Sequence, residues 1–152
     1  MASYVVSKAQ DIDEGGHLVV DINGRSVGVF HVGGEWYALL NRCPHRGGPM
    51  CEGLLVSYLE SDKPGEVRYD PSRKLLECPW HGWEFDIKTG QSYFDPARTR
   101  LRRYPVAVQS GEVIADELED EQQSDTHLVK GPYMAETYEV SIEDDYVVVS
   151  MR

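Results

Sequence analysis

Two short segments of the sequence each pair a cysteine with a histidine in a stretch that also holds proline and glycine. The first segment, CPHRGG, places Cys43 and His45 two positions apart, and the second, CPWHGW, places Cys78 and His81 three positions apart. Each segment leaves one expected strand and leads to another, as the tip of a hairpin does. Two such tips placed side by side would bring two thiolates and two imidazoles to one point, which is a ligand set for a metal centre.

Two kinds of metal centre use two cysteines and two histidines. A thiolate pair suits an iron bridged by sulfide and an imidazole pair suits a second iron, whereas the same four ligands also satisfy a tetrahedral zinc ion. Zinc fingers pair Cys with Cys and His with His along the chain, but here each segment holds one of each. The spacing therefore favours an iron–sulfur cluster over zinc. Neutral imidazoles also give such a cluster a higher reduction potential than an all-cysteine cluster has.

The segments CPHRGG and CPWHGWEFD resemble the signature of the Rieske [2Fe–2S] family, Cys-x-His followed by Cys-x-x-His. The resemblance covers most of the chain, from the strands before the first loop to the strand after a proline-containing cover loop at residues 94–97. It implies one [2Fe–2S] cluster with Cys43 and Cys78 on one iron. His45 and His81 would bind the other iron and lie nearer the surface.

The chain departs from the family pattern between the two loops. Thirty-two residues separate the second ligand from the third, and the excess, residues 57–73, is expected to form an inserted hairpin. This hairpin is either a docking element beside the cluster or a surface decoration far from it. Members from respiratory and photosynthetic cytochrome complexes carry a disulfide between the loops, with cysteines where this chain has Gly48 and Trp80. Cys51 has no such partner, and we expect it to be a small apolar filler.

The resemblance also bears on the reduction potential. The cytochrome-complex members carry Ser and Tyr hydroxyls that donate to the cluster and its ligand, and Trp83 and Phe85 stand in those places here. Because such donors stabilise the added electron, their absence predicts a low-potential cluster. The glycines of the loops, Gly47, Gly48 and Gly82, are expected to let the backbone approach the cluster and to offer N–H groups to its sulfurs.

Outside the loops the sequence predicts short strands and turns. Asn23-Gly24 and Gly33-Gly34 are hairpin signals, and no segment shows a helical period over three turns. Strands are expected at residues 4–6, 17–22, 26–32, 35–40, 54–59, 66–69, 84–87, 100–109, 112–115, 137–142 and 146–150, with turns at 63–65, 70–73 and 110–111. The expected fold is all-β, with Rieske-type stacked antiparallel sheets. It forms a single domain over residues 1–152, with an acidic connector at 116–136 and an extra C-terminal hairpin at 137–152.

The charge and composition exclude several classes of protein. The net charge is −11, with 26 acidic and 15 basic residues, which argues against nucleic acid as a partner. An acidic surface would suit a partner with a basic docking patch, or it could serve solubility alone. No apolar run approaches the roughly 20 residues that span a bilayer, and the N-terminus lacks the pattern of a signal peptide. A cytoplasmic protein without membrane contact is expected.

Other residues with possible chemistry lie outside the two loops. The remaining histidines, expected to be surface or strand residues and not iron ligands, are His17, His31 and His127. Four arginines after the cover loop are expected to pair with nearby acids along a half-exposed strand: Arg98, Arg100, Arg102 and Arg103. Trp80 and Trp83 flank His81 and are expected to shield the cluster from water.

These patterns predict a one-electron carrier with a low-potential Rieske cluster. Such a ferredoxin would pass electrons from a flavin reductase to a terminal oxygenase or reductase, without a substrate site of its own. One alternative is a small or accessory Rieske subunit of a larger reductase or oxygenase complex, comparable to the small subunit of assimilatory nitrite reductase. A second alternative is a redox-sensing module. Copurification would separate the first two, because a free ferredoxin purifies alone and a subunit stays bound to its partner.

Overall fold

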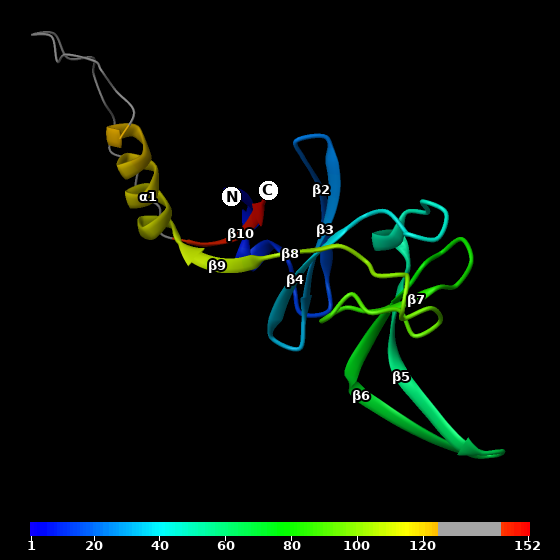
Figure 1. Cartoon of the computed structure of the whole chain (residues 1–152). Coiled ribbons are helices and arrows are strands. Elements are labelled where there is room, and N and C mark those ends of the chain that lie inside the picture. The colour runs from blue at the N-terminus through cyan, green and yellow to red at the C-terminus, as the bar shows by residue number, and fades with distance from the viewer. Residues whose placement is uncertain (125–143) are drawn as a thin grey trace, which may run out of the picture.

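The computed structural model describes residues 1–124 and 144–152, which form three antiparallel sheets (Figure 1). The first sheet has the strand order β1 (Ala2–Lys8), β10 (Asp145–Met151) and β9 (Val106–Ser110). The second has the order β2 (His17–Ile22), β3 (Arg25–Val32), β4 (Glu35–Leu40) and β8 (Arg103–Tyr104). The third has the order β5 (Leu54–Lys63), β6 (Glu66–Glu77) and β7 (Glu84–Asp86). The predicted all-β class with stacked antiparallel sheets is confirmed.

Two apolar clusters hold the sheets together, and the second sheet contributes to both. One cluster joins it to the first sheet through residues such as Val29, Tyr104 and Val149. The other joins it to the third sheet and to the loops, and includes Leu39, Leu76 and Phe85. Along the strands that contribute to these clusters, every second side chain points inward and is buried in one of them. The burial of this apolar surface is the main stabilising contribution in a fold of this size. The second sheet is therefore the frame on which the other two are placed.

The predicted strands at residues 17–22, 26–32 and 35–40 are confirmed as β2, β3 and β4, with a difference of one residue at the start of β3. Asn23 and Gly24 both have positive φ angles, of 53° and 75°, and Gly33 and Gly34 have φ angles of 63° and 73°. Two consecutive left-handed residues match the twist of the flanking strands, so these two-residue turns fix the register of the hairpins. The pairing of Val27 with Leu40 then sets where the first ligand loop begins.

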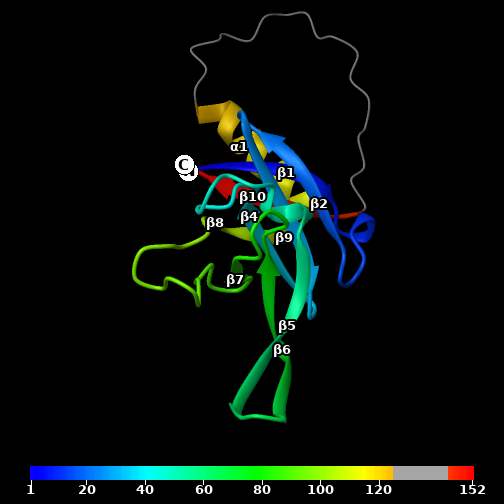
Figure 2. The ribbon, with the colours of Figure 1, turned by 90° about the vertical axis from the view of Figure 1, so that its right-hand side faces the viewer.

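Residues 57–73, predicted as an inserted hairpin, lie within the hairpin of β5 and β6, which turns at Pro64-Gly65 and projects away from the body of the molecule (Figures 1 and 2). The predicted turn at residues 70–73 is wrong, because β6 runs through it. Ser57 pairs with Lys74 and Tyr58 with Asp70, so three residues of β6 bulge out of the ladder. A bulge accommodates Pro71, which has no N–H to donate, without ending the strand.

The predicted hairpin of 100–109 with 112–115 is also wrong. Strand β9 ends at Ser110, and α1 (Gly111–Ser124) follows directly, which also replaces the first part of the predicted acidic connector. Residues 112–124 contain neither glycine nor proline, and six of these thirteen residues are Glu or Gln, which favour helix. The many acidic residues of this segment favoured the prediction of a solvated connector in place of a helix. Residues 125–136 of the predicted connector lie outside the described residues.

The C-terminal strand closes the first sheet. β10 pairs on one side with β1 and on the other with β9, so the two ends of the chain share one sheet. The predicted strand at 146–150 is confirmed, whereas its predicted hairpin partner at 137–142 lies outside the described residues. Within the described residues, no helix has the length and apolar character that crossing a membrane requires.

Cys51 is a buried part of the core, as predicted for an apolar filler. It lies in the short 3-10 helix η2 (Met50–Glu52) and is 0% exposed. Its N–H donates to the side-chain oxygen of Asn41 at 2.7 Å. The sulfur faces Gly28, where an added Cβ would lie 2.3 Å from it. Gly28 is therefore required by close packing and not by its backbone angles.

The burial of Cys51 predicts a loss of stability at alkaline pH. Burial raises the pKa of its thiol to about 12, whereas an unfolded chain ionises this group near pH 8.5. As the pH rises through this window, the unfolded chain loses the proton first. The free energy of unfolding should then fall by up to about 1.4 kcal/mol per pH unit from this source, with no effect at lower pH. Urea unfolding at about pH 8 and about pH 10 measures this slope.

A Cys51→Ala variant is the control for this prediction. It removes the ionisable thiol and is expected to lose less stability between the two pH values, although its stability at neutral pH is lower because of the cavity. An equal pH dependence in both proteins would show that the thiol is not held protonated by the fold.

Candidate metal centre

The two ligand loops leave strands of different sheets and touch each other. The first loop leaves β4 at Leu40 and leads into η2, and the second joins β6 to β7. The contact is close at Gly48, because a Cβ added there would lie 3.0 Å from the sulfur of Cys78 and 3.0 Å from the ring of Trp80. A glycine is therefore needed at position 48 for the loops to approach each other.

Both loops have the same internal hydrogen bonds. In the first, the N–H of Cys43 donates to the carbonyl of Gly48 at 2.8 Å, and the N–H of Gly47 donates back to the carbonyl of Cys43 at 2.8 Å. The second loop repeats both bonds, from Cys78 to Trp83 at 2.8 Å and from Gly82 to Cys78 at 2.9 Å. Gly47 and Gly82, four positions after their cysteines, have φ angles of 79° and 71°, which favour glycine.

These bonds correct one expectation. The N–H groups of Gly47 and Gly82 donate to the carbonyls of the preceding cysteines and not toward sulfur. At the first loop the backbone N–H groups of His45 and Arg46 act to lower the pKa of the Cys43 thiol, against the larger effect of its burial. The glycines therefore shape the backbone of both loops.

The four predicted ligands meet as two pairs across the loops. Cys43 and Cys78 are both buried, and the Cys78 thiol is close enough to help raise the pKa of Cys43. The rings of His45 and His81 lie edge to face, with centroids 4.9 Å apart. The Cys pair faces the core, whereas His81 is exposed and His45 half-buried. The arrangement thus has a thiolate end toward the interior and an imidazole end toward the surface.

The buried Nδ1 atom of His45 tests whether this site fits a metal. Within the described residues this nitrogen has no hydrogen-bond partner. Burial of an unpaired ring nitrogen is costly unless it binds something, and a metal ligand meets this requirement. Burial, aided by the nearby His81 and Arg46, lowers the pKa of His45 and so favours the neutral imidazole that binds metals. Burial and the adjacent Cys78 raise the pKa of the Cys43 thiol, so metal binding there would release a proton.

The pairing of donors also bears on the number of metal atoms. Among the described residues, no three His, Cys, Asp or Glu side chains converge closely enough to hold one ion. The four donors instead form a Cys pair and a His pair. Two pairs suit a centre with two irons, each with its own pair of protein ligands, better than a single tetrahedral zinc.

Aromatic side chains cover one side of the His pair. The ring of Trp83 stacks on His45, with centroids 4.2 Å apart and an interplanar angle of 12°, and Phe94 packs on Trp83 at 4.8 Å. The expectation that Trp80 and Trp83 flank His81 and shield the site is only partly met. Trp83 covers His45, whereas Trp80 is 58% exposed. Phe94, from the cover loop, is exposed beyond Trp83.

Of the three histidines outside the loops, His17 and His31 lie on strands, as expected. His17 stacks on Phe30, with ring centroids 5.1 Å apart. His31 stacks on Trp36 at 4.1 Å, and its Nδ1 lies 3.0 Å from the carbonyl oxygen of Ile12. His127 lies outside the described residues. Within the described residues the expected ion pairs of the arginine cluster are not seen, because no ion pair there includes Arg98, Arg100, Arg102 or Arg103.

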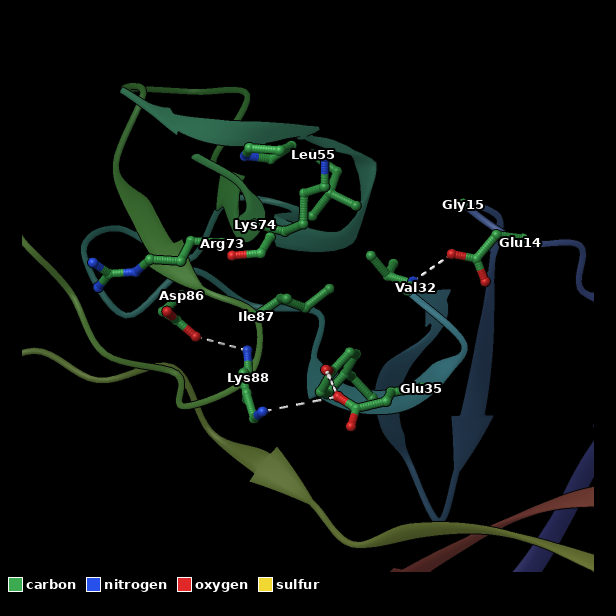
Figure 3. A pocket seen from close by; sticks show the side chains of 14 residues that line it. Glu14, Gly15, Val32, Glu35, Leu55, Arg73, Lys74, Asp86, Ile87 and Lys88 are labelled. Carbon is green, nitrogen blue, oxygen red and sulfur yellow. Dashed lines mark hydrogen bonds and ion pairs between the residues drawn. The ribbon is translucent and has the colours of Figure 1, made fainter. Parts of the chain in front are cut away.

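A cavity of about 520 Å³ lies between the β3–β4 turn, the base of β6 and the end of β7 (Figure 3). Its charged groups are held by neighbours. Lys88 lies 4.0 Å from Glu35, and Asp86 accepts the backbone N–H groups of Lys88 and Thr89 at 2.8 and 2.9 Å. Glu14 accepts the N–H groups of the β3–β4 turn, which lowers the pKa of its carboxyl. These interactions fix the β3–β4 turn and the turn after β7, and the Lys88–Glu35 ion pair links the two turns.

Comparison with known proteins identifies the family. A family model described as the Rieske [2Fe–2S] domain matches residues 2–105. The chain belongs to the Rieske [2Fe–2S] family. The 3-phenylpropionate/cinnamic acid dioxygenase ferredoxin subunit of Escherichia coli K12 is 37% identical over 106 residues, which cover 70% of this chain and 85% of that protein. As a Rieske protein, the chain carries one [2Fe–2S] cluster, and the paired donors described above fit it.

Solved Rieske structures share the fold. The ferredoxin of carbazole 1,9a-dioxygenase from Nocardioides aromaticivorans IC177 matches with a TM-score of 0.53 and 24% identity, over 72% of this chain and 91% of that one. A structure described as a complex of reduced oxygenase and oxidized ferredoxin in carbazole 1,9a-dioxygenase contains a chain that matches with a TM-score of 0.53 and 26% identity, over 71% and 95%. The matches to known ferredoxins thus cover nearly all of those chains.

Proposed function

We propose that this Rieske protein is a ferredoxin that carries single electrons from a reductase to an oxygenase or similar acceptor. The supporting observation is its likeness to a dioxygenase ferredoxin subunit over 85% of that subunit's length. The partners would be a flavin reductase and a terminal oxygenase. The cytoplasm is the proposed location, because the proposed ligand thiols must stay reduced until they bind iron.

We propose further that Cys43 and Cys78 hold one iron and that His45 and His81 hold the other. The cluster, when bound, supplies a centre that gains and loses one electron. The protein must then keep water away from the cluster and let a partner approach it, and each pair of side chains serves one of these purposes. The buried cysteines keep water from the inner side of the site, and the exposed ring of His81 leaves an edge within reach of a partner.

Residues 1–152 are proposed to be one domain. The support is the first sheet, in which β10 from the C-terminus lies between β1 and β9. The extra segments, the β5–β6 hairpin and α1, are then additions to one Rieske domain and not separate units.

Purification and reconstitution test the proposed function. The protein should purify without a large partner and, when added back, support turnover of an oxygenase by its reductase. Stable copurification with a large catalytic subunit would instead favour the accessory-subunit alternative. Turnover is measured with the wild-type protein and with the His81→Ala variant as a matched control. The difference between them shows whether turnover depends on the metal centre.

The midpoint potential is expected near the bottom of the Rieske range of roughly −150 to +300 mV. Phe85 is fully buried in the apolar cluster that contains both Cys43 and Cys78, and it has no hydroxyl to donate. Phe85→Tyr should raise the potential by about 40–80 mV if its hydroxyl reaches sulfur, because a charge-assisted hydrogen bond contributes roughly 1–2 kcal/mol to the reduced state. Protein-film voltammetry measures this shift.

Phe94→Tyr is the matched control, since it adds the same hydroxyl to an exposed ring. It should leave the potential unchanged. A wild-type potential well above zero would contradict the low-potential assignment and the oxygenase-type role that depends on it.

A further inference from the structure

Four arginines line one cavity beside the first ligand loop. The cavity has a volume of about 370 Å³ and includes His45 in its wall. The arginines come from two separate parts of the chain: Arg42, Arg46, Arg100 and Arg102. This one cavity thus takes four of the fifteen basic residues of a chain whose net charge is −11.

The pairing of β4 with β8 brings the two parts together. The N–H of Leu40 donates to the carbonyl of Arg102 at 2.9 Å, directly before the first loop leaves β4. Leu39 pairs with Arg103 in the same ladder. Residues 100–102 therefore lie alongside residues 40–47, although about sixty positions separate them in the sequence.

The positive charges of this cavity are not neutralised within the described part of the chain. Arg100 donates to the side-chain oxygen of Gln91 at 3.1 Å, and the guanidinium of Arg102 lies 5.3 Å from the ring centroid of Tyr104. The guanidinium of Arg42 lies beside Gly47. None of these partners is a carboxylate, and no acidic residue is among those that line the cavity.

We propose that this arginine-lined cavity docks a carboxylate-bearing surface of the redox partner protein next to His45. The proposal rests on the function proposed above and assigns the chemistry of the docking face. It also reverses, at this face, the expectation that an acidic surface seeks a basic partner. An otherwise acidic chain repels an acidic partner in every orientation except the one that presents the arginines, so the charge pattern orients the metal centre toward that partner.

A protein surface fits this cavity better than a small anion does. All four guanidinium groups belong to exposed residues, so water solvates them and a single small anion gains little. A partner surface would exclude that water and engage several guanidinium groups together. Exposed aromatic rings adjoin the same region, because Phe94 packs on Trp83, which stacks on His45. Aromatic residues and arginines together are the typical composition of a protein interface.

Oxidation of the reduced holoprotein by inorganic reagents tests the local charge without any partner protein. Each hexacyanoferrate(III) anion takes one electron, and its rate constant should fall as the ionic strength rises from about 0.01 M to about 0.5 M, since the arginines attract it. With the cation hexaamminecobalt(III) as oxidant, the rate constant should fall less steeply with ionic strength or should rise. A rate with the anion that rises with salt would mean that the net charge dominates, and it would overturn the proposal.

Matched variants locate the effect. Arg100→Gln with Arg102→Gln should slow the anionic oxidant at low salt by at least about threefold. Lys63→Gln with Arg68→Gln changes the net charge by the same amount at the β5–β6 hairpin, which projects away from the body in Figures 1 and 2, and should leave the rate near the wild-type value. Equal rates in the two double variants would contradict the proposal.

Binding of labelled poly-L-glutamate to the oxidised protein, measured by fluorescence anisotropy, tests the kind of occupant. Wild type and the hairpin variant should bind it, and the Arg100→Gln, Arg102→Gln variant should bind at least about threefold more weakly. Free glutamate or phosphate that competes equally well per charge would identify a small-anion site and overturn the assignment to a protein partner. If these results hold while reconstituted turnover fails, the docking face stands and the proposed oxygenase partner is wrong.

Discussion

Cys78→Ser and His45→Ala variants should be isolated with almost none of the two irons per chain that the wild type is expected to hold. Each change removes one member of a donor pair, so that one iron keeps a single protein ligand, and the folded loops can no longer hold it tightly. The supporting observations are the burial of both Cys43 and Cys78 and the Nδ1 of His45, which has no hydrogen-bond partner among the described residues. Iron and acid-labile sulfide analysis measures the loss, and electron paramagnetic resonance after dithionite reduction checks the type of cluster.

The matched controls are Cys51→Ala and His31→Ala, which change the same residue types away from the donor pairs. Cys51 faces Gly28, and His31 stacks on Trp36. Both variants should keep iron and sulfide at the wild-type ratio. Full iron content in Cys78→Ser or His45→Ala would show that the proposed ligands are wrong, and a wild type that binds one zinc without sulfide would exclude the cluster altogether.

Gly53→Ala should cause the largest loss of stability among single alanine substitutions of the glycines near the loops. A Cβ at this position would lie 1.7 Å from the carbonyl oxygen of Glu77, the residue before Cys78. The φ angle of Gly53 is −76°, which any residue adopts, so the cost is steric and not conformational. Because a backbone atom must move, we expect a loss of about 3 kcal/mol or more. The corresponding fall in Tm is roughly 6–12 °C for a chain of this length.

Gly65→Ala is the control for this prediction, because its cost comes from the backbone conformation and not from a steric clash. Gly65 has a φ angle of 83° and no atom within 4 Å of an added Cβ. Its substitution should cost only about 1–2 kcal/mol, from the left-handed backbone alone. Differential scanning calorimetry of the holoproteins compares the two, and a smaller fall in Tm for Gly53→Ala than for Gly65→Ala would contradict the steric argument.

The two ligand loops could be predicted from the chain because metal chemistry depends on residue type and short spacing. Both loops keep Cys at the first position and a left-handed glycine four positions later, and their backbone bonds are the same. The strands β2 to β4 were predictable for a similar reason. Their turns need positive φ at Asn23-Gly24 and Gly33-Gly34, which is a local requirement visible in the sequence.

The helix α1 and the bulge in β6 were not predictable in this way. In α1 the charge of the acidic residues favours a solvated connector, whereas their helix propensity favours a helix. The local sequence does not show which of these two effects is larger. In β6 the bulge at residues 71–73 depends on the partner strand, because Tyr58 pairs with Asp70 while its neighbour Ser57 pairs with Lys74. A turn and a bulge have the same local composition.

The arginine-lined cavity shows the same limit at the site. The sequence predicted the residue types around the cluster and their order, because the donors lie within a few positions of one another. It did not predict that Arg100 and Arg102 would lie beside Arg42 and Arg46, because this depends on the register of β8 against β4. That register is set by the burial of Leu39 and Tyr104 in the apolar clusters on either side of the second sheet. Burial acts between residues far apart in the chain, and for this reason the charge of the face beside His45 became visible only in the folded molecule.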